Sequence, residues 1–514
     1  MRLSTAVRVV VATLRKRPSD LLPFYVLGAA VPAITRVVPF LAFVVAYLAL
    51  ETTGRLEVIW TELATLEEPP ADPEADPEAF EQWSEAFATA IEPAFSPAEF
   101  GLFLVGLVVL TLVVTILLSV LLYALVSAGQ VATCYARLRD ERGLPAGVEG
   151  VRRYWLSFLG LFLLEFFFWM TAAAVVGTIT AMLVVVAISA GVGALGVLFA
   201  LFGLLTWLAL GAVIRALFAF TPVAVVVDDV SALRSVRASA GFLRRQPVEA
   251  IFYYAVAIVA LFGIGFLTSI LSVVGAPSLV ALLSVFVVLP ALDLLKTTLF
   301  GGYRRSISPP PAPDRSLRSQ FSGGIRRGWS ELLAFVRETP GIHAVVIAIS
   351  LGSFWVGWIA AAPFVDAGFE ASILARLEGV VPPIFALELF GNNWTVAFTT
   401  AFAGLALAIP ALASLAFNGF VFGIYARLEV DPDALLAFVA PHGLFEIPAI
   451  LVAGALGISL GLAWWRAVRG QLTRTELAND LERAFWVVVG LGVVLAVAAL
   501  LEGFVSPYYF RLFL

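Results

Sequence analysis

The sequence predicts an all-α polytopic integral membrane protein with about 11 transmembrane helices, six in its first half and five in its second. Of the 514 residues, 61% are hydrophobic and 13% are charged, and the mean hydropathy is +0.98. Soluble domains usually carry about 25% charged residues. Apolar runs of about 18 residues or more recur, each long enough to cross a hydrocarbon core about 30 Å thick as a helix.

The expected spans follow the apolar runs and the residues that interrupt them. In the first half they lie near 21–50, 100–130, 155–187, 195–225, 249–273 and 279–300. In the second half they lie near 342–364, 393–409, 410–427, 444–465 and 484–504. The stretch 393–427 could form one span or two, because it is too long for one straight helix and barely long enough for two. Pro410 is the expected break.

Basic residues predict the orientation, because cytoplasmic loops collect arginine and lysine. With the N-terminus inside and eleven spans, the inner segments hold 25 of the 32 basic residues, and the C-terminus lies outside. The inner segments 1–20, 134–153, 221–249, 303–340 and 466–483 hold 5, 5, 4, 7 and 4 of them. The outer segments hold Arg55, Arg376, Arg427 and Arg511.

Three inner segments place an Arg-x-x-Pro sequence just before a span, ending at Pro18, Pro247 and Pro340. Proline suits the first turn of a helix, so it can separate an interfacial helix from the next transmembrane helix. The preceding residues 230–243 and 317–336 are amphipathic at helical spacing. The favoured interpretation is that these amphipathic segments anchor the protein on anionic lipid. The alternative is that they sense or bend the inner leaflet.

The proline-rich segment SISPPPAPDRS, residues 306–316, predicts an extended spacer between a six-span domain, 1–305, and a five-span domain, 317–514. The outer loop 51–99 contains thirteen carboxylates and one arginine. Its segments LEVIWTELATL and FEQWSEAFATAI are expected to form short helices around a proline-rich stretch. The loop is expected to serve solubility in salt or contact with an extracellular or envelope partner.

Several function classes are disfavoured. The net charge of −5 gives no basis for nucleic-acid binding. The single cysteine, Cys134, excludes an intramolecular disulfide and a cysteine-cluster metal site. The first 20 residues lack the pattern of a removable signal peptide. The use of only two lysines, together with the acidic loop, suggests a high-salt or high-GC organism such as a halophilic archaeon.

Ionisable residues inside apolar runs are costly unless paired or hydrated, so they indicate functional positions. The first half contains five: Arg36, Glu165, Arg215, Asp293 and Lys296. The last four are expected toward the inner side, where they could form a structural ion-pair cluster or a site for an ion or lipid headgroup. Arg36 lies deeper, in a run broken by Pro32 and Pro39, and has no predicted partner.

The second half has a polar motif, PHGLFEIP, in which His442 and Glu446 are four residues apart and share a helical face. Glu502 is expected on the same, external side. Pro441 and Pro448 predict a bent or partly unwound start of the span. The candidate motif or ion pathway comprises Asn393, Asn418, Gly419, Gly423, Pro441, His442, Gly443, Glu446, Pro448 and Glu502.

The sequences NNW (392–394), FNGFVFG (417–423), PHGLFEIPAILVAGALGISLG (441–461) and LEGFVSP (501–507) resemble the stage II sporulation protein M family over about 340–514. The resemblance implies five spans with the N-terminus inside and the C-terminus outside. It also implies a non-catalytic role in organising an envelope assembly, since the namesake anchors a complex with two cell-wall hydrolysing partners. Residues 220–247 faintly resemble the membrane domain fused to some glycerophosphodiester phosphodiesterases.

Three functions follow as hypotheses for a multi-pass protein of the cell membrane. The first is a scaffold or membrane-remodelling factor that contacts membrane lipids and can form a homo-oligomer, with His442 and Glu446 as a structural clasp. The second is a channel or transporter for ions, protons or a lipid-like substrate, using His442, Glu446 and Glu502. The third is an intramembrane enzyme. It is disfavoured because the chain has two histidines and no diagnostic motif, so the sequence predicts no metal and no other cofactor.

Overall fold

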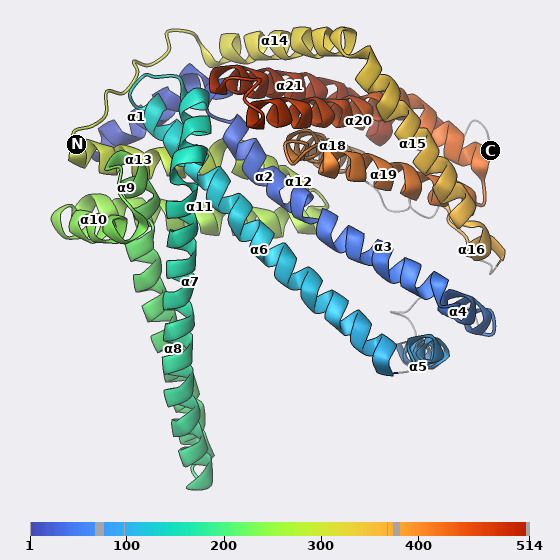
Figure 1. Ribbon diagram of the computed structural model, residues 1–514. Coiled ribbons are helices and arrows are strands. Elements are labelled where there is room, and N and C mark those ends of the chain that lie inside the picture. Colours follow the sequence, from blue (N-terminus) through green and yellow to red (C-terminus); the bar gives the residue numbers. More distant parts are fainter. Residues whose placement is uncertain (1, 67–76, 97, 367–368, 374–380, 510–514) are drawn as a thin grey trace.

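The computed structural model describes residues 2–66, 77–96, 98–366, 369–373 and 381–509 (Figure 1). Within these ranges the regular structure is helical, apart from an isolated bridge between Ala371 and Glu429. The proline-rich part of the acidic loop, Arg376 and Arg511 lie outside the described residues.

Ten helical segments in the described ranges are long and apolar enough to cross a membrane. Six lie in the first half: α2 (Pro23–Thr35) with α3 (Val37–Thr52), α6 (Ala98–Arg137), α7 (Gly143–Ser189), α8 (Gly193–Phe218) with α9 (Thr221–Val227), α11 (Pro247–Val274), and α12 (Ser278–Leu283) continuing through η2 (Ser284–Val288) into α13 (Leu289–Arg304). Four lie in the second half: α15 (Pro340–Ala360) with α16 (Ala362–Asp366), α19 (Ile409–Leu428), α20 (Pro432–Val468), and α21 (Arg474–Phe504) with α22 (Ser506–Tyr509).

The stretch 393–427 contains parts of two helices, with bounds that differ from those expected. Helix α18 (Pro382–Ala403) begins well before Asn393, and α19 begins at Ile409, with Pro410 in its first turn. The break therefore falls where Pro410 predicted it, but the span expected at 393–409 is wrong in its bounds. Helix α18 is not among the ten apolar segments.

Amphipathic helices precede the spans in the basic segments. They are α1 (Leu3–Lys16), α10 (Ala232–Arg245) and α14 (Leu317–Glu338), and the helices α11 and α15 begin at Pro247 and Pro340, as predicted. Pro18 instead begins a short 3-10 turn, η1 (Pro18–Asp20), and the next α-helix starts at Pro23. Residues 306–316 carry no helix.

The described parts of the acidic loop form two helices, α4 (Arg55–Leu63) and α5 (Pro77–Phe95), which pack on each other. They cover most of the two segments for which short helices are predicted. Arg55 stabilises the end of the loop by donating a hydrogen bond to the carbonyl of Ala94 at 2.8 Å.

The two halves of the chain share one hydrophobic core. Helix α18 packs against α2 and α12, and α21 packs against α7. Figure 1 shows α20 and α21 side by side with α14 along them, while α7 and α8 form a long hairpin that leads away from this group. Glu388 of α18 also accepts a hydrogen bond at 2.9 Å from the backbone N–H of Ser278, at the start of α12.

Glycines bring the helices of the second half into backbone contact. A Cβ on Gly357 of α15 would overlap the carbonyl of Phe420 on α19, and one on Gly423 of α19 would overlap the carbonyl of Phe354. Gly404 and Gly457 meet in the same way between α18 and α20. Small residues allow such close approach between helices in membranes. The second half is therefore a tightly packed bundle.

Candidate functional site

His442 and Glu446 lie on α20, which is continuous from Pro432 to Val468. Of the bent or partly unwound start predicted from Pro441 and Pro448, the unwound alternative is wrong, because both prolines lie inside this helix. Asp431 caps its N-terminus by accepting a hydrogen bond at 2.9 Å from the backbone N–H of Ala434. A proline in a membrane helix is tolerated where neighbouring helices cover the backbone group that loses its partner.

The side chains of His442, Glu446 and Glu502 converge, and we call these three residues the His–Glu cluster. One ligand atom from each lies within 4.8 Å of the others. His442 Nε2 is 4.0 Å from Glu502 Oε1, a distance that suits an ion pair but is too long for a hydrogen bond. The carboxyl groups of Glu446 and Glu502 lie within hydrogen-bonding reach of each other. The cluster joins the first turns of α20 to the end of α21.

Ser506, the first residue of α22, holds the other side of the imidazole. Its hydroxyl is 3.0 Å from His442 Nδ1, and the ring also hydrogen-bonds the backbone of Phe438, one turn earlier on α20. Ser506 is fully buried and His442 is 6% exposed. Sequence reasoning missed Ser506, although Glu502 and Ser506 have the same four-residue spacing as His442 and Glu446.

The remaining motif residues lie apart from the cluster or support the helices around it. Asn393 accepts a hydrogen bond at 3.1 Å from Asn392 in the middle of α18 rather than at the start of a span. Gly419 and Gly423 pack against α15, and Asn418 precedes them on α19. Gly443 is buried next to His442 on α20. The structure therefore brings together only the histidine and the two glutamates of the motif.

The intramembrane charges of the first half form two ion pairs. Arg215 Nη1 lies 2.8 Å from Glu165 Oε1, and Lys296 Nζ lies 2.7 Å from Asp293 Oδ1. Tyr25 donates a hydrogen bond at 3.0 Å to the other oxygen of Asp293. Arg36 is exposed at the joint between α2 and α3.

The five basic segments are joined to one another by side-chain contacts, and we call the surface they form the basic face. Lys16 contacts Asp140, Arg153 contacts Asp229, Arg304 contacts Asp228, Arg474 contacts Glu149, and Arg142 and Arg327 contact Glu482. These contacts link 1–20, 134–153, 221–249, 303–340 and 466–483. All five segments therefore lie on one side of the protein.

A cavity of about 530 Å³ opens in the basic face, and we call it the basic cavity. Its basic lining residues outnumber its acidic ones, Asp20 and Glu482. The Arg327 guanidinium lies over the ring of Trp486, 4.6 Å from its centre. The basic lining residues are Arg15, Lys16, Arg17, Arg142, Arg315 and Arg327.

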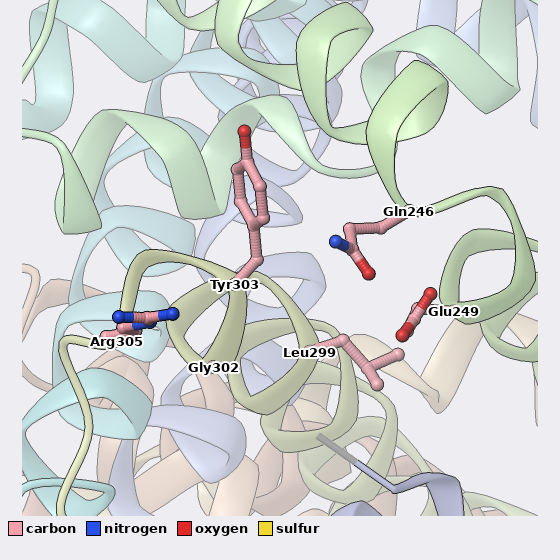
Figure 2. A pocket seen from close by; sticks show the side chains of 6 residues that line it. All are labelled: Gln246, Glu249, Leu299, Gly302, Tyr303 and Arg305. Carbon is pink, nitrogen blue, oxygen red and sulfur yellow. The ribbon is translucent and has the colours of Figure 1, made fainter.

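A second, smaller cavity of about 210 Å³ lies between the start of α11 and the end of α13 (Figure 2). Figure 2 shows Gln246 and Glu249 near each other on one side of the cavity, with Arg305 on the other side of Tyr303. Arg245 donates a hydrogen bond at 3.3 Å to the Tyr303 hydroxyl. This cavity marks the joint between α10 and α11, and its side chains form no concentrated charge of either sign.

The fold and these sites define the class of the protein, a multi-pass α-helical membrane protein with a polar cluster between two of its helices. Residues 345–507 match the family described as Stage II sporulation protein M, so the chain is similar to that family over this segment. The match includes all three residues of the His–Glu cluster and Ser506. No curated protein and no solved structure matches the chain.

Proposed function

We propose that the protein is a non-enzymatic scaffold of the cell membrane that holds anionic lipid at its inner surface. The observation that carries the proposal is that polar side chains bond neighbouring helices to one another. Glu165 with Arg215 joins α7 to α8, and Glu388 joins α18 to α12 across the two halves. Charges used in this way fix the arrangement of helices, which suits a rigid assembly platform.

The proposal includes eleven spans, with the N-terminus inside and the C-terminus outside. Helix α18 is the eleventh span, because its 22 residues suffice to cross the hydrocarbon core. The shared position of the five basic segments on one face supports this orientation, since basic residues collect on the cytoplasmic side. In this orientation the His–Glu cluster faces the outer leaflet.

The basic cavity supports the choice of an anionic lipid headgroup as ligand. It lies at the end of α1, just before the first span, where a headgroup of the inner leaflet can reach it. Trp486 supplies an aromatic wall, and tryptophan is enriched at membrane interfaces. Each basic residue near an anionic membrane surface contributes about 1 kcal/mol to lipid attraction.

Reversing two charges of the basic cavity should therefore weaken lipid binding. We expect Arg17→Glu with Arg315→Glu to lower retention of phosphatidylglycerol by about tenfold or more in detergent micelles doped with this lipid. Bound lipid is counted by native mass spectrometry. The matched control is Arg318→Glu with Arg326→Glu, which changes the net charge equally at α14 residues that do not line the cavity. Equal loss in both double variants would contradict a site at the cavity.

The second candidate function is a channel or transporter, and the His–Glu cluster is the observation that favours it. Intramembrane carboxylates next to a histidine are typical of cation or proton pathways. Ion and proton flux at high salt distinguishes the two functions. It is measured in proteoliposomes that contain either the wild type or Glu446→Gln. The scaffold proposal predicts no flux above that of protein-free liposomes in either protein. Flux in the wild type that Glu446→Gln abolishes would replace the scaffold with a transporter.

A further inference from the structure

We propose that His442, Glu446 and Glu502 bind one divalent transition-metal ion, for which Zn²⁺ is the probe. The inference does not depend on the scaffold role, because a bound ion could support either a rigid platform or a transport pathway. It rests on the geometry of the cluster and on the hydrogen bonds that orient the imidazole.

The position of the proton on the His442 ring decides which nitrogen can bind a metal ion. The backbone group of Phe438 that meets the ring is one turn earlier on α20, where a helix presents its carbonyl. A carbonyl only accepts hydrogen bonds, so the ring nitrogen that meets it carries a proton. Nδ1 lies 3.0 Å from the Ser506 hydroxyl, which can accept a hydrogen bond from it. In the neutral tautomer with its proton on Nδ1, Nε2 presents a lone pair, and this atom faces Glu502 at 4.0 Å.

The charge in the His–Glu cluster favours a cation. The lone pair of Nε2 and the oxygens of two carboxyl groups meet within 4.8 Å. Three acceptors at this separation repel one another unless a cation or a proton lies among them. Their side chains are largely enclosed, since those of His442 and Glu502 are 8% and 13% exposed. Little water reaches the cluster to screen this repulsion, so a bound cation would stabilise it.

The mixture of one nitrogen and two carboxylate ligands selects the kind of cation. Ca²⁺ and Mg²⁺ prefer oxygen ligands alone, whereas Zn²⁺ and related divalent transition-metal ions accept imidazole together with carboxylate. Three protein ligands leave a coordination position open for water. Zn²⁺ ligands lie about 2.0–2.2 Å from the metal, so ligand atoms now up to 4.8 Å apart must draw together. Rotation of the glutamate side chains about their single bonds can provide this movement.

A hydrogen bond behind the imidazole supports it as a ligand. Histidines that bind metals nearly always use the other ring nitrogen in a hydrogen bond, which fixes the orientation of the ring. The Ser506 hydroxyl occupies this position at Nδ1 of His442. Ser506 is therefore a positioning residue, whose loss should weaken metal affinity without removing a ligand.

The test measures metal on the purified full-length protein. The protein is stripped with a chelator in detergent, reloaded with Zn²⁺, freed of excess ion, and analysed by mass spectrometry for metal per chain. We expect one Zn²⁺ per chain in the wild type and loss in His442→Ala, Glu446→Gln and Glu502→Gln. Ser506→Ala should lower the affinity about 10-fold to 100-fold. X-ray absorption should show nitrogen and oxygen ligands without sulfur.

The matched control is Glu165→Gln, which removes an intramembrane carboxylate outside the cluster and should leave Zn²⁺ binding unchanged. Size-exclusion profiles show whether each variant is folded. A wild type that retains no Zn²⁺ after reloading would overturn the proposal even if every variant misfolds. Equal Zn²⁺ content in folded Glu446→Gln and wild type would overturn it as well, and would leave a shared proton as the stabilising cation.

Discussion

Replacing Asp20 by alanine should destabilise the protein by about 3–5 kcal/mol, because it leaves the Arg137 guanidinium buried without its carboxylate. The two side chains are 4% and 0% exposed, and Arg137 Nη1 lies 3.7 Å from Asp20 Oδ2. Asp20 also accepts hydrogen bonds at 2.7 and 3.0 Å from the backbone N–H groups of Gly143 and Leu144, at the start of α7. The change therefore removes both an ion-pair partner and a helix cap.

Chemical unfolding in mixed micelles measures this loss. Asp140→Ala is the matched control, because Asp140 pairs with Lys16 at 3.0 Å but is 45% exposed. An exposed pair of this kind contributes about 0–1 kcal/mol. If the two variants unfolded at the same denaturant concentration, the buried pair would contribute no more to stability than the exposed pair.

Gly357→Leu should separate α15 from α19 and cost about 3 kcal/mol or more. Its Cβ would overlap the carbonyl of Phe420, a backbone group that cannot turn aside as a side chain can. Overpacking of a well-packed contact costs about 1–3 kcal/mol, and more when the backbone must move. Unfolding in mixed micelles and disulfide trapping between cysteines introduced on the two helices measure the effect.

Gly352→Leu on the same helix provides the control for the added side chain. Gly352 is exposed, and a Cβ placed on it meets no described atom within 4 Å. This substitution should leave both the stability and the trapping of α15 against α19 near wild-type values. Equal damage from the two substitutions would point to helix propensity or insertion rather than to the contact with Phe420.

Hydropathy and proline position predicted most of the helices, because a membrane span must satisfy its backbone internally and be apolar over its length. The start of α18 escaped this reasoning. Glu388, Asn392 and Asn393 lower its hydropathy, so the apolar run seemed to begin after them. In the structure Glu388 is bonded to Ser278, and Gly391 lies against the same segment of α12. This contact of Glu388 with another helix compensates its polarity, and no local sequence pattern records such a contact.

The candidate site was predictable to the extent that it depends on helical spacing. His442 and Glu446 share a face of α20 for that reason, and Glu502 was expected on the same side of the membrane. The hydrogen bond to Ser506 depends on the short helix that follows α21, and the pairing of Asp20 with Arg137 depends on how α1 and η1 return to α6. Such contacts join segments far apart in the chain, so composition and periodicity carry no signal for them.

The basic face also has a consequence for the order of events during synthesis. Arg142 reaches the membrane early, but its partners Asn479 and Glu482 belong to the last pair of long helices. Ser19, near the N-terminus, likewise donates its hydrogen bond to Glu482 at 3.0 Å. A nascent chain therefore holds its first spans without these bonds until α21 has left the ribosome. Final closure of the basic face is thus a late event of translation, and a chain truncated before α21 should stay open to membrane quality-control proteases.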